Sequence, residues 1–253
     1  MAKVIEFIGP SGAGKSTVYN DINHLMTNDN NFSTFIGSKI DQIEIIKTFK
    51  KKRFKIFNFT EFQKVYINDT DKQQDSLNKF LKINKELIDE LWNAVANDNK
   101  HVNNAEIRQQ VLNFVYKRIT ETQLILDSTN HEYIIHDDGL FHNSVFFYNR
   151  NKWKELEYFF EFFHKFYQPS KVIFFNIQLP ELVERVRNRK IKTILENDLS
   201  ESDLIKKCKE SITMFEIKKQ FLKKNNVKNI EIDATLDVQT KVQMILSFLN
   251  SHD

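Results

Sequence analysis

Glycine, proline and cysteine are all scarce in this chain, whose 253 residues include five, three and one of them, respectively. The single cysteine, Cys208, excludes an intramolecular disulfide, which fits a reducing compartment. Cys208 lies on an apolar stripe at helical spacing, so we expect it to pack in the core. Repeats, linkers and low-complexity segments are also absent from the sequence.

Long apolar runs and a strong charge of one sign are missing as well. No run approaches the roughly 18 apolar residues of a membrane-spanning helix, and the N-terminus lacks the apolar stretch of a signal peptide. The 37 basic and 34 acidic residues nearly balance, which disfavours nucleic acid or a membrane as a partner. We therefore expect a cytoplasmic protein without a membrane span.

The few glycines concentrate at one place in the chain. Three of the five lie in EFIGPSGAGKST, residues 6–17. This stretch fits the P-loop pattern G-x-x-x-x-G-K-[ST], which begins here at Gly9 and ends at Ser16. An apolar, β-branched run at 3–8 precedes the motif, and apolar residues at helical spacing follow it. Strand, turn and helix are the context that a P-loop requires.

The residue types of this motif suit a polyphosphate. Glycine lets the backbone wrap around phosphates without a Cβ in the way, and successive N–H groups and a helix N-terminus attract the anion. We expect Lys15 to contact the β and γ phosphates and the Ser16 hydroxyl to bind Mg²⁺. ATP and Mg²⁺ are the predicted cofactors, although the motif does not separate ATP from GTP. The predicted nucleotide-binding residues are Gly9, Ser11, Gly12, Ala13, Gly14, Lys15, Ser16 and Thr17.

Strands and helices alternate along the rest of the chain, which predicts an α/β fold with a parallel sheet. Further strands are predicted at 32–36, 133–135, 171–177 and 228–232. Helices are predicted at 179–190, 202–224 and 236–250, and the region 41–126 is predicted to be mostly helical. The run LILD at 124–127 continues an apolar helical stripe, so we predict a helix end there rather than a strand.

Two classes of P-loop protein are disfavoured by motifs that the sequence lacks. No N-K-x-D follows the P-loop, which argues against a GTPase. No stretch similar to L-S-G-G-Q is present either, and most of the glycines are already in the P-loop, which argues against a transporter ATPase. Small-molecule kinases are among the classes of P-loop protein that these absences leave in place.

Residues 171–190, KVIFFNIQLPELVERVRNRK, resemble nucleoside and nucleotide kinases of the thymidylate kinase type. In that family a strand leads through a Pro-Glu turn into a helix that carries R-x-x-x-R at the start of a lid. The matching residues here are Pro180, Glu181, Arg185 and Arg189. The resemblance implies a lid at about 185–200 whose two arginines neutralise the moving phosphate and exclude water. From the residues alone, a solvated basic helix face is the alternative.

The end of the chain carries the same resemblance, because residues 225–249 are similar to the last strand, short loop and closing helix of that family. There the loop lies near the nucleotide base, which corresponds to about Asp233 to Thr235. The resemblance covers the P-loop, the lid region and the C-terminus. It implies a P-loop NTPase fold over 1–253 as a single domain, with three layers, about five parallel strands and a helical acceptor-binding insertion at about 41–126.

Acidic residues follow the strand predicted at 133–135, in HDDG. A carboxylate at such a strand end can hold Mg²⁺ through water or accept the proton of an acceptor hydroxyl, so Asp137 and Asp138 are candidates for both roles. Thymidylate kinases carry D-R-Y or a similar motif here, from which D-D-G departs.

His136 is expected to face the core. Asp41 is a second candidate base, with a helix-start aspartate as the alternative.

The helical insertion is longer than such kinases usually have, which suits either a bulkier acceptor or a homodimer surface. Its stretch FKKKRFK at 49–55 fits a contact with phosphate, a polyanion or acidic lipid, or else a solvated helix face. The aromatic run YFFEFFHKFY at 158–167 keeps helical spacing, so we expect it to lie in the core.

The predicted function is therefore transfer of the ATP γ-phosphate to a small-molecule acceptor, which is a nucleoside, a nucleotide or sugar-like. The predicted catalytic residues are Lys15, Asp137, Asp138, Arg185, Arg189 and Asp41, and the predicted metal ligands are Ser16 and Asp137. The alternative is a nucleotide-binding switch or ATPase whose helical insertion binds a macromolecule. Within the kinase class, a polynucleotide or nucleotide-sugar kinase of the zeta-toxin type is a third interpretation.

Overall fold

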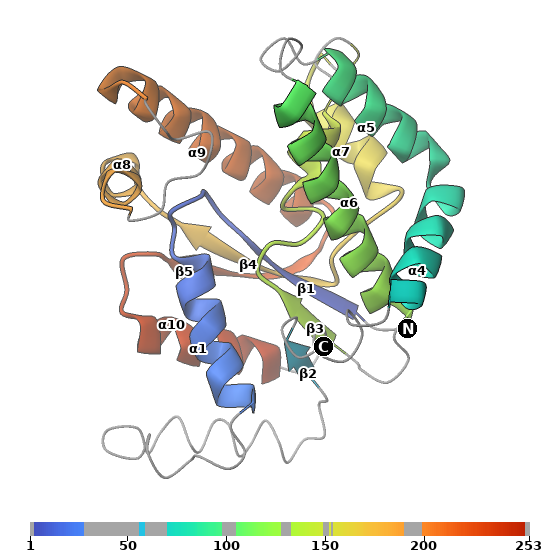
Figure 1. Ribbon diagram of the computed structural model, residues 1–253. Coiled ribbons are helices and arrows are strands. Elements are labelled where there is room, and N and C mark those ends of the chain that lie inside the picture. Colours follow the sequence, from blue (N-terminus) through green and yellow to red (C-terminus); the bar gives the residue numbers. More distant parts are fainter. Residues whose placement is uncertain are drawn as a thin grey trace. The chain divides into compact units, whose positions relative to one another are not determined.

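The computed structural model describes residues 3–27, 56–58, 70–97, 105–127, 133–148, 152, 154–189 and 199–250. Its strands are β1 (Lys3–Ile8), β2 (Ile56–Asn58), β3 (Tyr133–His136), β4 (Lys171–Asn176) and β5 (Lys228–Asp233). Its helices are α1 (Lys15–Thr27), α4 (Thr70–Ile83), α5 (Lys85–Asn97), α6 (Ala105–Asp127), α7 (Leu156–His164), α8 (Leu179–Arg187), α9 (Glu201–Lys224) and α10 (Val238–Asn250), with the 3-10 helix η2 at Ser144–Phe147 (Figure 1).

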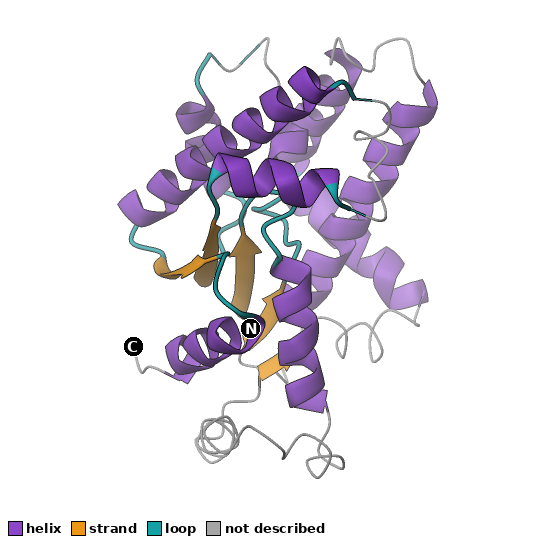
Figure 2. Cartoon of the chain, turned by 90° about the vertical axis from the view of Figure 1, so that its left-hand side faces the viewer, coloured by secondary structure: helices purple, strands orange, loops and turns teal. Residues whose placement is uncertain are grey.

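These strands form one five-stranded sheet in the order β2-β3-β1-β4-β5. Strand β3 pairs in parallel with β1 on one side and with β2 on the other. Helices connect the strands and make up most of the described chain (Figure 2). The α/β fold class with a parallel sheet is therefore confirmed.

Most predicted elements are found close to their expected bounds, including the helix end at Asp127. The segment Ile56–Asn58 is a correction, because the sequence placed it in a helical region and the structure makes it a strand beside β3. Strand formation over three residues depends on the partner strand rather than on local pattern, which explains the error. The strand predicted at 32–36 lies outside the described residues.

The chain divides into two compact units. The first, here called the insertion unit, contains Met1–Glu6 and Lys55–Lys171, and the second, the P-loop unit, contains Phe7–Phe54 and Val172–Asp253. The boundary falls inside β1, so this strand supplies residues to both. The prediction of a single domain over the whole chain stays a prediction.

Aromatic side chains form the core of the insertion unit. Phe159, Phe160 and Phe163 of α7 are fully buried. The ring of Phe141 lies 5.8 Å from those of Phe160 and Phe163, and the ring of Phe147 lies 5.3 Å from that of Phe163. Each such burial contributes about 1.5–3 kcal/mol before opposing terms. The apolar face of the run at 158–167 is thus core, as predicted, and packs against the chain that follows β3, while Tyr158 at the start of the run is 57% exposed.

In the P-loop unit, the end of β1 and the start of α1 are tied to β4. The ring of Phe7 lies 5.3 Å from that of Phe175 on β4 and 6.2 Å from that of Tyr19 on α1. Helix α1 packs on α10, as Figure 1 shows, and α8 packs on α9. Cys208 of α9 is buried, as predicted. This packing holds the turn between β1 and α1 in one place.

Candidate functional site

The P-loop lies between β1, which ends at Ile8, and α1, which begins at Lys15. Gly12 and Gly14 have φ angles of 105° and 87°. Residues with a Cβ rarely adopt this left-handed region, so glycine is required at both positions. The predicted context of strand, turn and helix is therefore present. At Gly12 and Gly14 the backbone has a left-handed conformation that glycine adopts without strain.

Gly9 is required for a different reason, which is the close approach of β4. A Cβ built on Gly9 would lie 2.9 Å from both the Cβ and the carbonyl oxygen of Phe175. Such a contact is shorter than real Cβ atoms show, and backbone cannot easily move away. The first glycine of the motif thus allows the loop to lie directly against the end of β4.

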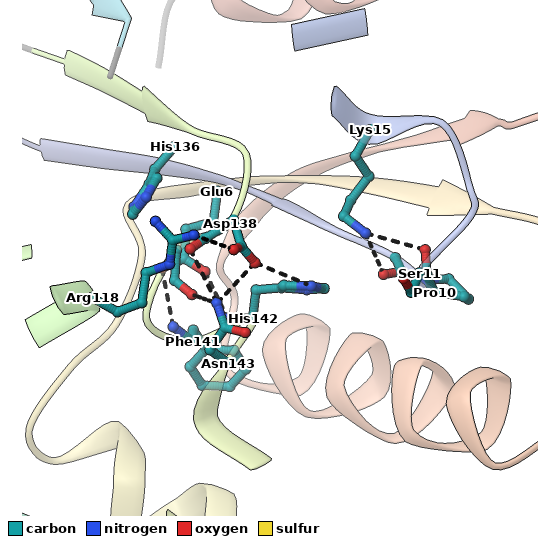
Figure 3. Close-up of polar contacts among 12 residues, drawn as sticks. Glu6, Pro10, Ser11, Lys15, Arg118, His136, Asp138, Phe141, His142 and Asn143 are labelled. Atoms are coloured by element: carbon teal, nitrogen blue, oxygen red, sulfur yellow. Dashed lines mark hydrogen bonds and ion pairs between the residues drawn. The ribbon is translucent and has the colours of Figure 1, made fainter. Parts of the chain in front are cut away.

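Lys15 folds back over this loop. Its ammonium donates hydrogen bonds to the carbonyl oxygens of Gly9, at 2.8 Å, and Pro10, at 3.1 Å (Figure 3). The side chain is buried, with 9% of its surface exposed. A buried ammonium held by carbonyl oxygens can exchange them for phosphate oxygens, which bind it more strongly.

Ser16 and Thr17 follow in the first turn of α1, and both are exposed. The first turn of this helix contains no acidic residue, so its partial positive charge is not offset locally. Among the described residues, no group of three or more His, Cys, Asp or Glu side chains could hold a metal ion.

Both arginines of the R-x-x-x-R pattern lie against the P-loop within the same unit. Nη2 of Arg189 donates a hydrogen bond to the Ser11 hydroxyl at 3.1 Å. Nη1 of Arg185 lies 3.6 Å from the position that a Cβ of Gly14 would occupy. The structure thus brings two guanidinium groups, one from α8 and one from just beyond its end, to the P-loop.

Arg185 is anchored at two of its three nitrogens. Its Nε donates to Glu181 Oε1 at 2.6 Å, one turn earlier on α8, and its Nη2 donates to the Ala234 carbonyl oxygen at 3.0 Å. In the described part of the chain, Nη1 donates to no group. The guanidinium is therefore fixed in orientation while one NH₂ group faces the loop.

In the insertion unit, the end of β3 leads into a turn at 137–142. His136 pairs in register with Glu6 of β1, and both are fully buried. Burial, with Arg118 as a further cause, lowers the pKa of His136 to about 3. This imidazole is therefore neutral at pH 7, and the expectation that His136 faces the core is confirmed.

Glu6 holds the turn after β3 in place. Its Oε1 accepts hydrogen bonds from the Phe141 N–H at 3.1 Å and from the Tyr167 hydroxyl at 2.6 Å, and its Oε2 accepts one from the His142 N–H at 2.9 Å (Figure 3). A Cβ on Gly139 would lie 2.2–2.5 Å from the Glu6 side chain. Burial and the carboxylate of Glu6 raise the pKa of Tyr167 well above its usual value.

Asp138 lies at the centre of a charged cluster. Its Oδ2 accepts a short hydrogen bond from Nη2 of Arg118 on α6, and its Oδ1 accepts one from the Asn143 amide at 2.9 Å. Nε2 of His142 lies 3.7 Å from Oδ1. Burial alone would raise the pKa of Asp138, but His142, Arg118 and Asn143 outweigh it and lower the pKa to about 2. Asp138 therefore stays ionised in the folded protein.

Arg118 connects this cluster to α6. Its Nη1 donates to Glu121 Oε2 at 2.7 Å, and that carboxylate is only 2% exposed. Nε of Arg118 is buried and has no hydrogen-bond partner among the described residues.

The sequence did not identify Glu6, Arg118 or Asn143 as site residues. A glutamate inside the otherwise apolar strand KVIEFI is a signal that could have found Glu6, because buried carboxylates are rare without partners. No local signal distinguishes Arg118 from the other basic residues of the insertion. Asp41, Gly37, the basic stretch at 49–55 and the centre of the predicted lid at 190–198 lie outside the described residues.

Comparisons with known proteins give no match to a family model or to a curated protein. Among solved structures, three of deoxyadenosine kinase from M. mycoides are similar to the chain: one with bound dATP (TM-score 0.44), one with the products dCMP and a flexible dCDP (0.48) and one with dCTP (0.45). Each is 18% identical to the chain, and the likeness covers 98% of this chain and 100% of the other protein. At this level of likeness, function has to be argued from the chain's own residues.

Proposed function

We propose that the protein is an ATP-dependent phosphotransferase that moves the γ-phosphate to a small-molecule acceptor, which is a nucleoside, a nucleotide or sugar-like. The observation that carries this proposal is the arrangement in the P-loop unit. There a glycine loop, the ammonium of Lys15 and the guanidinium groups of Arg185 and Arg189 converge on one place. Four sources of positive potential around one loop suit a triphosphate.

The donor half of the proposed reaction follows from these contacts. Lys15 leaves the carbonyl oxygens of Gly9 and Pro10 to bind the β and γ phosphates, while the loop N–H groups hold them in place. Arg185 and Arg189 neutralise charge on the transferred group. Bound Mg²⁺, held in part by Ser16, would offset the charge of the β and γ oxygens.

The acceptor half of the proposal rests on the turn after β3. Asp138 has a pKa of about 2 and both of its oxygens accept hydrogen bonds, so it is a weak base and suits orientation of Arg118 or of an acceptor hydroxyl. Asp137 is then the candidate for accepting the hydroxyl proton or for a water-mediated contact with Mg²⁺. Asp41 stays a predicted alternative base.

The experiment that tests this function measures ATP consumption by purified protein with Mg²⁺ against nucleosides, deoxynucleosides, nucleotides and sugars, with mass spectrometry of the products. A kinase gives stimulation by one acceptor class and a product heavier by one phosphoryl group. Slow hydrolysis that no acceptor changes would instead favour the nucleotide-binding switch. Lys15→Ala serves as the inactive control, and Lys206→Ala, which removes an exposed lysine on α9, serves as the matched one.

No helix in the described part of the chain is long and apolar enough to cross a membrane. The basic stretch at 49–55, on which the switch interpretation mainly rested, lies outside the described residues.

A further inference from the structure

Lys241 is a buried lysine to which the donor site described above gives no role. It lies in the first full turn of α10, and only 4% of it is exposed. Its ammonium donates a hydrogen bond of 2.6 Å to the carbonyl oxygen of Ala234. The same oxygen accepts the hydrogen bond from Nη2 of Arg185. One backbone carbonyl thus holds two cationic side chains from two different helices.

This arrangement is electrostatically unfavourable for Lys241 considered alone. A cation near a helix N-terminus is repelled by the partial positive charge there, and burial removes the ammonium from water. Burial and the nearby charge of Arg185 lower the pKa of Lys241, while Asp237 and Asp233 act in the opposite direction. An apolar residue would fill the same place at less cost, so packing does not explain a lysine here.

The hydrogen bond from Lys241 also affects the position of the Ala234 carbonyl. The Ala234 N–H donates to the Asn176 carbonyl oxygen at 2.8 Å, which ties the residue to the end of β4. The hydrogen bond from Lys241 then fixes the direction of the carbonyl on the other side of the residue. A carbonyl oxygen has two lone pairs, and the second is directed to Arg185.

We propose that Lys241 is a positioning residue for Arg185, which it holds over the P-loop through the Ala234 carbonyl. This inference rests on the proposed function, because it assigns Arg185 to the transferred phosphate. Glu181 and Ala234 hold two nitrogens of the guanidinium, and Nη1 faces Gly14. Loss of Lys241 frees the carbonyl to rotate and so removes one of the two anchors.

A double-mutant cycle tests this proposal. Lys241→Met keeps the length of the side chain and removes its charge and donor. We expect it to lower kcat roughly tenfold with little change in the KM for ATP, because a misplaced group costs rate more than ground-state binding. In the Arg185→Met background the same change should lower kcat by less than about twofold, since the group that Lys241 positions is already gone.

A matched variant separates positioning from general stability. Lys218 on α9 has the same exposed fraction, 4%, and belongs to the same unit. Lys218→Met should lower the Tm and leave kcat nearly unchanged. Equal losses of kcat from Lys241→Met in both Arg185 backgrounds, or an unchanged kcat, would overturn the proposal. If Lys241→Met does not fold, Lys241→Leu, which also removes the charge and the donor, replaces it in the cycle with the same criteria.

The cycle can also be measured without turnover, by calorimetric titration with ADP and aluminium fluoride, which mimics the transferred phosphoryl group in the transition state that Arg185 is proposed to contact. If no acceptor is phosphorylated by the wild-type protein, the proposed function fails while the positioning test still stands. A non-additive loss of affinity for ADP and aluminium fluoride across the four proteins supports the role of Lys241. An additive loss, or none, contradicts it.

Discussion

Two turns that follow neighbouring strands of the sheet contain glycines that are needed for different reasons, although Gly9 in the first turn shares the steric reason found in the second. In the P-loop after β1, Gly12 and Gly14 are needed because their φ angles are positive. In the turn after β3, Gly139 has no positive φ, and a side chain there would collide with Glu6, which lies far away in the sequence. The first requirement belongs to the backbone of the motif itself, and the second exists only in the folded chain.

The same contrast extends to the charged groups of the two turns. Lys15 makes its contacts with Gly9 and Pro10, six and five residues away. Asp138 depends on Arg118, and the turn that carries it depends on Glu6, more than a hundred residues away. A phosphate-binding loop can therefore be recognised from a short motif, whereas the turn after β3 can be understood only with its distant partners.

The largest expected effect is that of Lys15→Ala on turnover. Removal of the ammonium should lower kcat by about a thousandfold, by analogy with the loss of one preorganised donor to developing charge. Steady-state kinetics with the identified acceptor measure it, with Lys206→Ala as control. A residual kcat within tenfold of wild type would remove Lys15, and with it the P-loop, from the proposed mechanism.

Arg189→Ala should have the next largest effect. We expect kcat to fall about a hundredfold, while the Kd for ATP changes much less, because the guanidinium acts on the transferred group. Arg187→Ala, which removes an exposed arginine paired with Glu201, is the matched control. An unchanged kcat in Arg189→Ala would contradict the assignment of this residue to a lid.

Gly139→Ala and Gly12→Ala test the contrast between the two turns directly. Gly139→Ala should lower the free energy of unfolding by about 1–3 kcal/mol through overpacking against Glu6. Gly12→Ala should cost about 1–2 kcal/mol through its φ of 105°, with further crowding against Leu182 and Val186. Chemical denaturation measures both.

The losses in free energy of unfolding caused by Gly139→Ala and Gly12→Ala should respond differently to Glu6→Ala. In that background the cost of Gly139→Ala should largely disappear, because the colliding carboxylate is gone, while the cost of Gly12→Ala should persist. If the cost of Gly139→Ala were the same with and without Glu6, its cause would be local and the contrast between the two turns would be lost.

The last expected effect concerns pH. His136 has a usual pKa of 6.5 and a folded-state pKa of about 3. Between these values the unfolded chain binds a proton that the folded protein does not, so the free energy of unfolding should fall as the pH drops from about 6.5 towards 3. His136→Leu should flatten this dependence. A wild-type stability that stays constant over this window would show that His136 is not held neutral by burial.

Sequence patterns predicted much of the fold, and in the candidate site they pointed to the P-loop and to the aspartates after β3 but not to the partners of those aspartates. The helix end at Asp127 and strand β4 followed from periodicity, and the P-loop followed from its motif and flanking elements. Strand β2 was missed, because three residues become a strand only beside β3. Arg118 and Lys241 were missed because nothing near them in the sequence marks their partners.

The sequence by itself determined the α/β class and the P-loop motif between a strand and a helix, because those features depend on spacing and on backbone conformations that neighbouring residues set. Only the tertiary structure decided which carboxylate is restrained by Arg118, why Gly139 must lack a side chain, and how Arg185 is anchored. The physical reason is that a hydrogen bond or a collision depends on distance in space. Residues 135 positions apart, such as Glu6 and Phe141, meet only after the strands have paired.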